Sequence, residues 1–198
     1  MGRTSNKQIN REKLLDQGVI VLMEQGYHGT GLQEILDAVQ VPKGSFYNYF
    51  ASKESFGAEV VQRYIEPFLV QLQAYLQNPQ YDSLDAIKAY FDELIDELER
   101  QQFKGGCLLG NLMGELGDTS DICRESLQRA VAAYRDLLKT GLTRAQMEGL
   151  IRSDLSAEKM ADLLVNAWQG ALLRMKIEKS VAPLKDCCNS LLEGYFKG

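Results

Sequence analysis

Apolar residues recur every three to four positions along most of the chain, which is the spacing of amphipathic α-helices. The first such segment covers about 8–25, and Gly26 follows it where the C-terminal cap of a helix would lie. The same spacing predicts long helices over 52–76, from Ser83 onward, over 121–146, over 157–179 and from Pro183 onward. We find no segment that alternates apolar and polar residues as a β-strand does. The sequence therefore predicts an all-α fold.

Two short helices are predicted among the long ones. Thr30-Gly31-Leu32-Gln33 fits a capping box, so one short helix is expected from Gly31 to about Gln40. Pro42 suits the first position of the next, which is expected over about 42–49. Two short helices joined by a three- to four-residue turn are typical of a helix-turn-helix unit. The glycine-rich segment 104–118 is expected to be irregular.

The second short helix combines aromatic and polar residues in a way that neither a core nor a solvated face requires. Phe46, Tyr49 and Phe50 can pack it against its neighbours, which leaves the polar residues of the segment toward the outside. On such a surface a glycine allows close approach and a serine fits a major groove, while lysines and a tyrosine hydroxyl can hold phosphates. The same spacing also fits a small helical subdomain whose tyrosines only pack.

Composition and charge narrow the class of protein. The chain has 198 residues, 45% of them hydrophobic, and a net charge of −5. Residues 1–63 are balanced in charge, with a basic arm of Arg3, Lys7, Arg11 and Lys13, so the net negative charge lies in 64–198. This distribution permits nucleic-acid binding at the N-terminus. The N-terminus has no apolar signal segment, and the apolar runs are shorter than a membrane span, so a cytoplasmic protein is expected.

Residues 29–56, "GTGLQEILDAVQVPKGSFYNYFASKESF", resemble the DNA-binding signature of the TetR family of bacterial repressors. The resemblance implies a three-helix helix-turn-helix domain over 1–53 and a larger helical effector-binding and dimerisation domain over 54–198. It further implies repression at a near-palindromic double-stranded DNA operator, relieved by a small-molecule effector, without a cofactor. Carried over by position, the DNA contacts are Thr30, Lys43, Gly44, Ser45, Tyr47, Asn48 and Lys53. The chain departs from the family at Gln40, where the turn usually has glycine.

A second resemblance concerns the larger domain. "KGGCLLGNLMGELGD" and "MKIEKSVAPL" are similar to the branch of the N-ethylmaleimide-responsive repressor, which implies that Cys107 and Lys176 sense reactive electrophiles or oxidants. The alternative is a non-covalent apolar effector, with Cys107 as a small packing residue beside the pocket. Aromatic and soft side chains suited to an apolar pocket complete the predicted effector site, which comprises Tyr64, Phe68, Phe91, Phe103, Cys107, Met113, Tyr134, Trp168 and Lys176.

The last two predicted helices are apolar on more than one side, which predicts a four-helix dimer interface. The interface residues expected from the stripes are Leu164, Trp168, Leu172, Leu184, Cys188, Leu191 and Tyr195.

Two other classes of function fit these residues less well. A thiol enzyme would need a base beside Cys107, but the only histidine, His28, lies in the helix-turn-helix segment. The adjacent Cys187 and Cys188 lack the spacing of metal ligands, so no metal or catalytic residue is expected. A helical interaction module without DNA would not need polar residues and lysines clustered around one turn.

Overall fold

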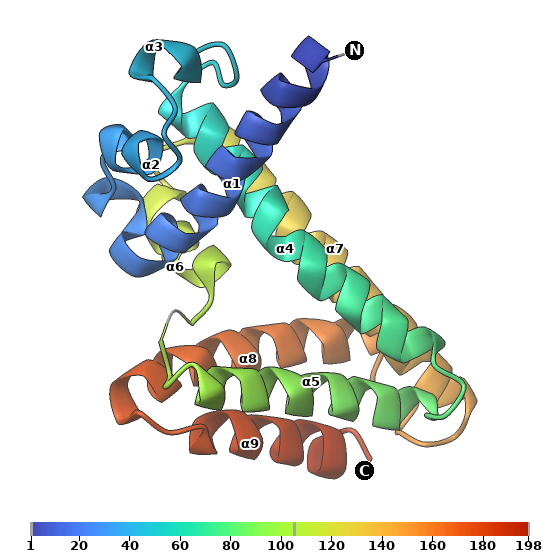
Figure 1. The fold of residues 1–198 in the computed structure, drawn as a ribbon. Coiled ribbons are helices and arrows are strands. Elements are labelled where there is room, and N and C mark those ends of the chain that lie inside the picture. Colours follow the sequence, from blue (N-terminus) through green and yellow to red (C-terminus); the bar gives the residue numbers. More distant parts are fainter. Residues whose placement is uncertain (1, 105, 198) are drawn as a thin grey trace. The chain divides into compact units, whose positions relative to one another are not determined.

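The computed structural model describes residues 2–104 and 106–197, with side chains from residue 7 onward. These residues form helices, turns and bends without a β-strand, which confirms the all-α class. None of the described helices is long and apolar enough to cross a membrane. The helices, shown in Figure 1, are α1 (Gly2–Gly29), α2 (Leu32–Ala38), α3 (Lys43–Phe46), α4 (Lys53–Gln77), α5 (Ser83–Arg100), α6 (Leu108–Leu116), α7 (Asp121–Met147), α8 (Ala157–Glu178), α9 (Ala182–Cys188) and the π-helix η1 (Asn189–Tyr195).

The chain forms two compact units, each built from two segments. The first contains Met1–Glu66 and Cys107–Val131, and the second contains Pro67–Gly106 and Ala132–Gly198. From the sequence, a single domain boundary is expected after residue 53. In the structure the unit with the helix-turn-helix also includes α6 and the first turns of α7, because these segments pack on α1 and α4.

The core of the first unit is an aromatic cluster under α3. Phe46 is fully buried, and its ring centroid lies 5.2 Å from that of Phe50 and 5.6 Å from that of Phe56. Gly18 of α1 allows the close approach, because a Cβ there would lie 2.5 Å from Cζ of Phe56. These contacts fix α3 on α1 and α4, as the aromatic spacing predicted.

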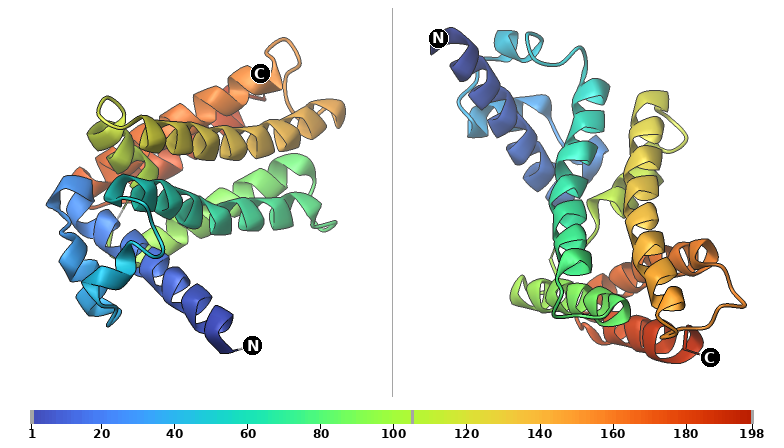
Figure 2. Two further views of the ribbon diagram at one scale, coloured as in Figure 1. Left: turned by 90° about the horizontal axis from the view of Figure 1, so that it is seen from above. Right: turned by 90° about the vertical axis from the view of Figure 1, so that its right-hand side faces the viewer.

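Helices α4 and α7 run beside each other within each unit, as both views in Figure 2 show. In the first unit the buried Ser126 hydroxyl donates to the carbonyl of Ala58 (2.6 Å) and accepts from the side-chain amide of Gln62 (2.8 Å). In the second unit Arg144 donates to the carbonyl of Leu76 (2.8 Å). A buried polar group that is fully bonded fixes one alignment of the two helices, since a shift would leave it without partners.

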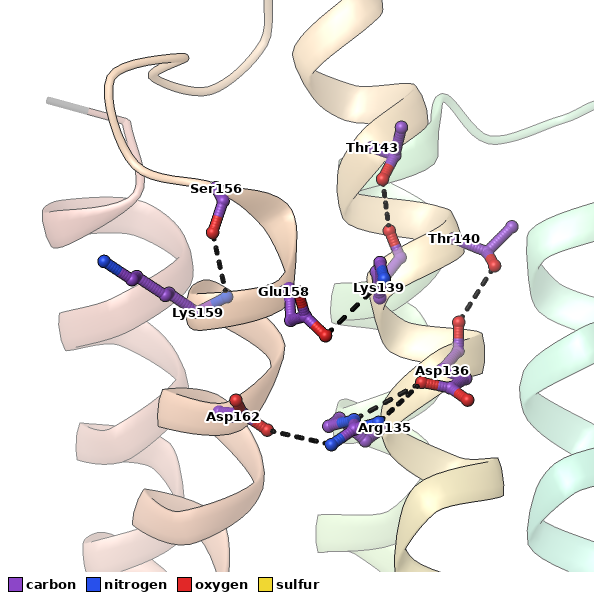
Figure 3. Close-up of polar contacts among 9 residues, drawn as sticks. All are labelled: Arg135, Asp136, Lys139, Thr140, Thr143, Ser156, Glu158, Lys159 and Asp162. Carbon is purple, nitrogen blue, oxygen red and sulfur yellow. Dashed lines mark hydrogen bonds and ion pairs between the residues drawn. The ribbon is translucent and has the colours of Figure 1, made fainter.

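In the second unit, α5, α8 and α9 lie side by side (Figure 1). Phe91 of α5 packs on Trp168 of α8, with 4.7 Å between ring centroids. On the surface, α7 is joined to α8 by Arg135–Asp162 and Lys139–Glu158 pairs at 3.7 Å (Figure 3). These exposed pairs contribute little free energy, so the apolar contacts hold this unit together.

Three predicted local features are wrong. The segment 104–118 is not irregular throughout, because Leu108, Leu109, Leu112 and Leu116 share a buried face and make α6 helical. Thr30 is not the cap of α2; Gly31 takes that position without a side-chain bond. The two short helices are also shorter than predicted, at Leu32–Ala38 and Lys43–Phe46.

The turn between α2 and α3 contains a strained residue. Gln40 has a φ of 55°, in the left-handed region that favours glycine. Its N–H bonds the carbonyl of Asp37 (3.2 Å), and the N–H of Val41 bonds that of Leu36 (3.0 Å), the pattern of a Schellman motif. Gln40 stands where the turn usually has glycine in the TetR family, and a left-handed φ is the conformation that glycine adopts most readily. In this left-handed conformation a residue with a side chain lowers the folding stability by about 1 kcal/mol or slightly more, compared with glycine.

Candidate functional sites

One face of α3 and the following turn is open to solvent. Lys43, Gly44, Tyr47 and Asn48 are exposed, Tyr47 at 61% of its surface, while Ser45 is half-buried. A Cβ at Gly44 would meet no atom within 4 Å, so this glycine leaves room for an external surface. The exposed residues occupy adjacent turns on the side opposite Phe46. The structure thus brings together five of the predicted DNA contacts.

Thr30 is in a different position from these five residues. Its side chain is 2% exposed, and its hydroxyl donates to the carbonyl of Gly26 at 2.6 Å. In this conformation the hydroxyl is bonded within the protein, and the expectation that Thr30 contacts DNA stays a prediction. Thr30 closes the turn that leads from α1 into α2.

Lys53 also bonds the same turn. Its ammonium donates to the carbonyls of Tyr27 (2.8 Å) and Thr30 (2.7 Å) and lies 4.3 Å from the centroid of the Tyr27 ring. Partial burial lowers the pKa of Lys53, and Glu115 acts in the opposite sense. Two of the three donors of Lys53 are used inside the protein, a restriction that the sequence did not indicate.

Glu115 of α6 was not identified as a functional candidate from the sequence. Its carboxylate accepts from the main-chain N–H groups of Tyr27 (3.1 Å) and His28 (2.9 Å). An acidic residue in the last turn of a helix is disfavoured by the helix dipole, and Glu115 stands in the last turn of α6. That unfavourable placement was the only signal available in the sequence.

The residues predicted for the effector site are distributed over both units. Tyr64, Cys107 and Met113 belong to the first, where Tyr64 is buried and Met113 is 39% exposed. The second contains Phe91 and Trp168, which are buried and in contact at a tilt, together with the half-buried Phe68, Phe103, Tyr134 and Lys176. Within the second unit, Tyr90 joins the Phe91–Trp168 pair to Tyr134, with 6.2 Å between the centroids of Tyr90 and Tyr134.

Cys107 is the N-cap residue of α6, and its side chain is half-buried. Gly106, just before it, has a φ of 79°, and a Cβ there would lie 2.9 Å from Cδ of Lys176. Burial raises the pKa of Cys123 and Cys187, and it raises that of Cys188 to about 12. These three cysteines are therefore less reactive than an ordinary thiol.

Most of the predicted dimer residues are covered within the protomer. At most 8% of the surface is exposed for Leu164, Trp168, Leu172, Leu184 and Cys188, which pack in the core of the second unit. Their assignment to the dimer interface stays a prediction. Leu191 is half-buried and Tyr195 is 50% exposed. A different set of residues on α8 is open, here called the outer stripe: Leu163, Gly170, Leu173 and Ile177.

The described residues contain no group of three or more His, Cys, Asp or Glu side chains that could hold a metal ion. The described side chains of the helix-turn-helix therefore include no such group.

Comparisons with known proteins agree with these observations. Residues 14–60 match the family model of bacterial regulatory proteins of the tetR family, and residues 83–191 match the tetracyclin repressor-like C-terminal domain. The chain is 38% identical to the HTH-type transcriptional repressor DhaR of Mycobacterium sp. (strain GP1) over 94% of this chain and 92% of that one. It is 31% identical to the HTH-type transcriptional repressor NemR of Escherichia coli (strain K12), over 89% and 88% of the two chains.

Solved structures show the same fold. The reduced form of E. coli NemR superposes with a TM-score of 0.85 at 30% identity, over 92% of this chain and 94% of that one. A regulatory protein TetR from Rhodobacter sphaeroides gives a TM-score of 0.85 at 30% identity, over 92% and 97%. The match to both family models, the identity to characterised repressors and the shared fold lead to one conclusion: the chain belongs to the TetR family of helix-turn-helix transcriptional regulators.

Proposed function

We propose that this protein is a dimeric transcriptional repressor that binds a near-palindromic operator through α3 and releases it when a small-molecule effector binds. The observation that supports this function best is the open polar face of α3, held in place by the buried Phe46. A helix that only packed would not keep Tyr47 61% exposed. A repressor acts on the chromosome, so we place the protein in the cytoplasm and assign it no catalytic activity.

We assign Lys43, Gly44, Ser45, Tyr47 and Asn48 to the DNA surface. Lys43 and the Tyr47 hydroxyl suit phosphates, while Ser45 and Asn48 suit base edges. In the dimer two α3 helices would enter successive major grooves about 34–36 Å apart. Thr30 and Lys53 contribute indirectly, by fixing the turn that precedes α2.

Selection of binding sites from random DNA tests the function, and Lys43→Ala tests the surface. We expect the wild-type protein to select a near-palindrome. Because a phosphate contact releases counterions and carries no sequence information, Lys43→Ala should weaken binding to all sites. The slope of log affinity against log salt, measured by fluorescence anisotropy, should fall by about 1 per half-site.

Lys185→Ala is the matched control for this experiment, since it removes an equal charge from an exposed position on α9. It should retain the wild-type slope. Equal slopes for wild type, Lys43→Ala and Lys185→Ala would exclude Lys43 from the DNA surface. Failure to select any site would overturn the proposed function itself.

We assign the dimer interface to the outer stripe of α8, with Leu191 and Tyr195 at its edge. Leu163, Gly170, Leu173 and Ile177 follow one another at steps of seven, three and four residues, so they lie along one side of the helix. Leu173 is 56% and Ile177 83% exposed, which is unusual for large apolar side chains in a row. A Cβ at Gly170 would meet nothing within 4 Å, so a partner helix can approach closely there.

For the effector we propose a reactive electrophile or oxidant that modifies Cys107. Support comes from its half-buried position at the start of α6 and from the 31% identity to NemR. N-Ethylmaleimide is a suitable probe: the sulfur adds to the maleimide double bond, and the thiol proton is taken up by the neighbouring carbon.

N-Ethylmaleimide should release operator DNA from the wild-type protein but not from Cys107→Ser. Cys187→Ser removes another half-buried thiol and should respond as wild type does. The measurement is anisotropy of labelled operator, with mass spectrometry of the adducts. If N-ethylmaleimide releases DNA from all three proteins alike, or from none of them, Cys107 is a packing residue. The next step would then be a screen for reversible apolar ligands, and the aromatic cluster around Phe91 would be the first place to map their binding.

A further inference from the structure

We infer that Glu115 is the residue through which α6 sets the position of the helix-turn-helix, by holding the turn between α1 and α2 in its DNA-binding conformation. This inference rests on the proposed operator binding for its functional consequence. The contact itself is a property of the first unit alone, because α1, α4 and α6 all belong to it.

The turn Gly26–Thr30 requires outside partners. Gly26 has φ 75° and ψ 176°, which breaks the helical path of α1 just before a last short turn. The first N–H groups after such a break have no acceptor one turn earlier, as at any helix start. Glu115 supplies an oxygen to each of two of them, at 3.1 Å for Tyr27 and 2.9 Å for His28.

The carbonyl groups of the same turn are bonded from the other side. The ammonium of Lys53, from α4, holds the carbonyls of Tyr27 and Thr30, and the Thr30 hydroxyl holds that of Gly26. The turn is thus clamped between a carboxylate on α6 and an ammonium on α4. Tyr27 is bonded through both its N–H and its carbonyl, so removal of either charge leaves a main-chain group of this turn unsatisfied.

We call Glu115 and Lys53, with the turn that they hold, the clamp, and its residues fit closely together. A Cβ at Gly26 would lie 2.5 Å from Oε1 of Glu115, so the carboxylate fits only beside glycine. In addition, Nε2 of His28 lies 3.4 Å from the main-chain oxygen of Glu115. The carboxylate is near the C-terminus of α6, where the dipole opposes it, and two charge-assisted hydrogen bonds offset that cost.

Glu115, the acidic residue of the clamp, lies on the same helix as Cys107. Cys107 caps the first turn of α6 and Glu115 lies eight residues later, about 12 Å along the helix axis. A movement of α6 that separates Glu115 from Tyr27 and His28 would free the turn and misplace α2 and α3. Through this contact, the position of α6 relative to the turn sets the affinity of the protein for its operator.

Glu115→Gln tests the inference, since it preserves size and removes the charge and one acceptor. We expect the operator Kd to rise at least tenfold, or about 1.4 kcal/mol. Hydrogen exchange at the amides of Tyr27 and His28 should accelerate, while exchange in α5 and α8 stays unchanged. Asp118→Asn, an exposed carboxylate just beyond α6, is the charge-matched control and should change neither measurement.

A second pair of variants separates positioning from simple loss of stability. Gly26→Ala strains the main chain at a φ of 75° and also drives a methyl group into the carboxylate, and Glu115→Ala removes the second of these two effects. The loss of operator affinity caused by Gly26→Ala should therefore be smaller when Glu115→Ala is already present. Unchanged exchange and affinity in Glu115→Gln, or additive effects in the double variant, would overturn the inference. If wild type bound no operator, the proposed function would fail, while the exchange measurement would still decide whether the clamp exists.

Discussion

Leu173→Asp is expected to convert the protein into a monomer and to reduce operator affinity by a factor of about 10² to 10⁴. The side chain is 56% exposed in the middle of the outer stripe of α8, so aspartate is tolerated in the isolated protomer. In the dimer it would place two desolvated charges near the twofold axis, which costs several kcal/mol. Each half-site contact then loses the high effective concentration that its linked partner supplies.

Light scattering and operator titration measure the two effects, and two controls define their cause. Met147→Asp changes an apolar residue that is 78% exposed at the end of α7, off the stripe, and should leave a dimer. Leu164→Asp changes a fully buried residue one position from Leu163 and should unfold the second unit rather than dissociate it. A dimeric Leu173→Asp protein with full operator affinity would show that the interface lies elsewhere.

The Leu164 and Leu173 contrast also shows how far the sequence determines this structure. Periodicity identified α8, which begins after Ser156, whose hydroxyl accepts from the N–H of Lys159. Periodicity could not decide which apolar side of α8 packs inside the subunit, because α8 has apolar residues on two sides. The placement of α5 and α9 settles that choice, and α5 lies more than 50 residues before α8 in the sequence.

The helix-turn-helix was predicted better than its supporting contacts. Phe46 and Phe50 pack inward and Tyr47 outward because local spacing alone separates these directions on a short helix. Thr30 and Lys53 carry polar groups that could equally bond DNA or the main chain. In the protein they bond the carbonyls of Gly26 and Tyr27, and these bonds depend on how the end of α1 is folded and on how α4 packs against it. Glu115 lies 88 residues from Tyr27 in sequence, beyond the reach of any local pattern.

A last prediction separates the two sides of α3 with one pair of adjacent residues. Phe46→Ala is expected to destabilise the first unit by about 3–5 kcal/mol, because a fully buried ring that contacts Phe50 and Phe56 leaves a cavity. Operator binding should be lost with it, since α3 has no other large anchor: of its four residues, Phe46 alone is buried. Urea unfolding followed by circular dichroism gives the free energy.

Tyr47→Ala should show the opposite combination. Tyr47 is 61% exposed, and its edge-on contact with the Phe46 ring, at 5.4 Å between centroids, is worth about 0.5–1.5 kcal/mol. Unfolding should therefore change little, while operator affinity falls at least tenfold because a phosphate contact and a groove-facing ring are lost together. If Tyr47→Ala bound operator as tightly as wild type, the open face of α3 would not be the DNA surface. A loss of stability equal to that of Phe46→Ala would instead make Tyr47 part of the core.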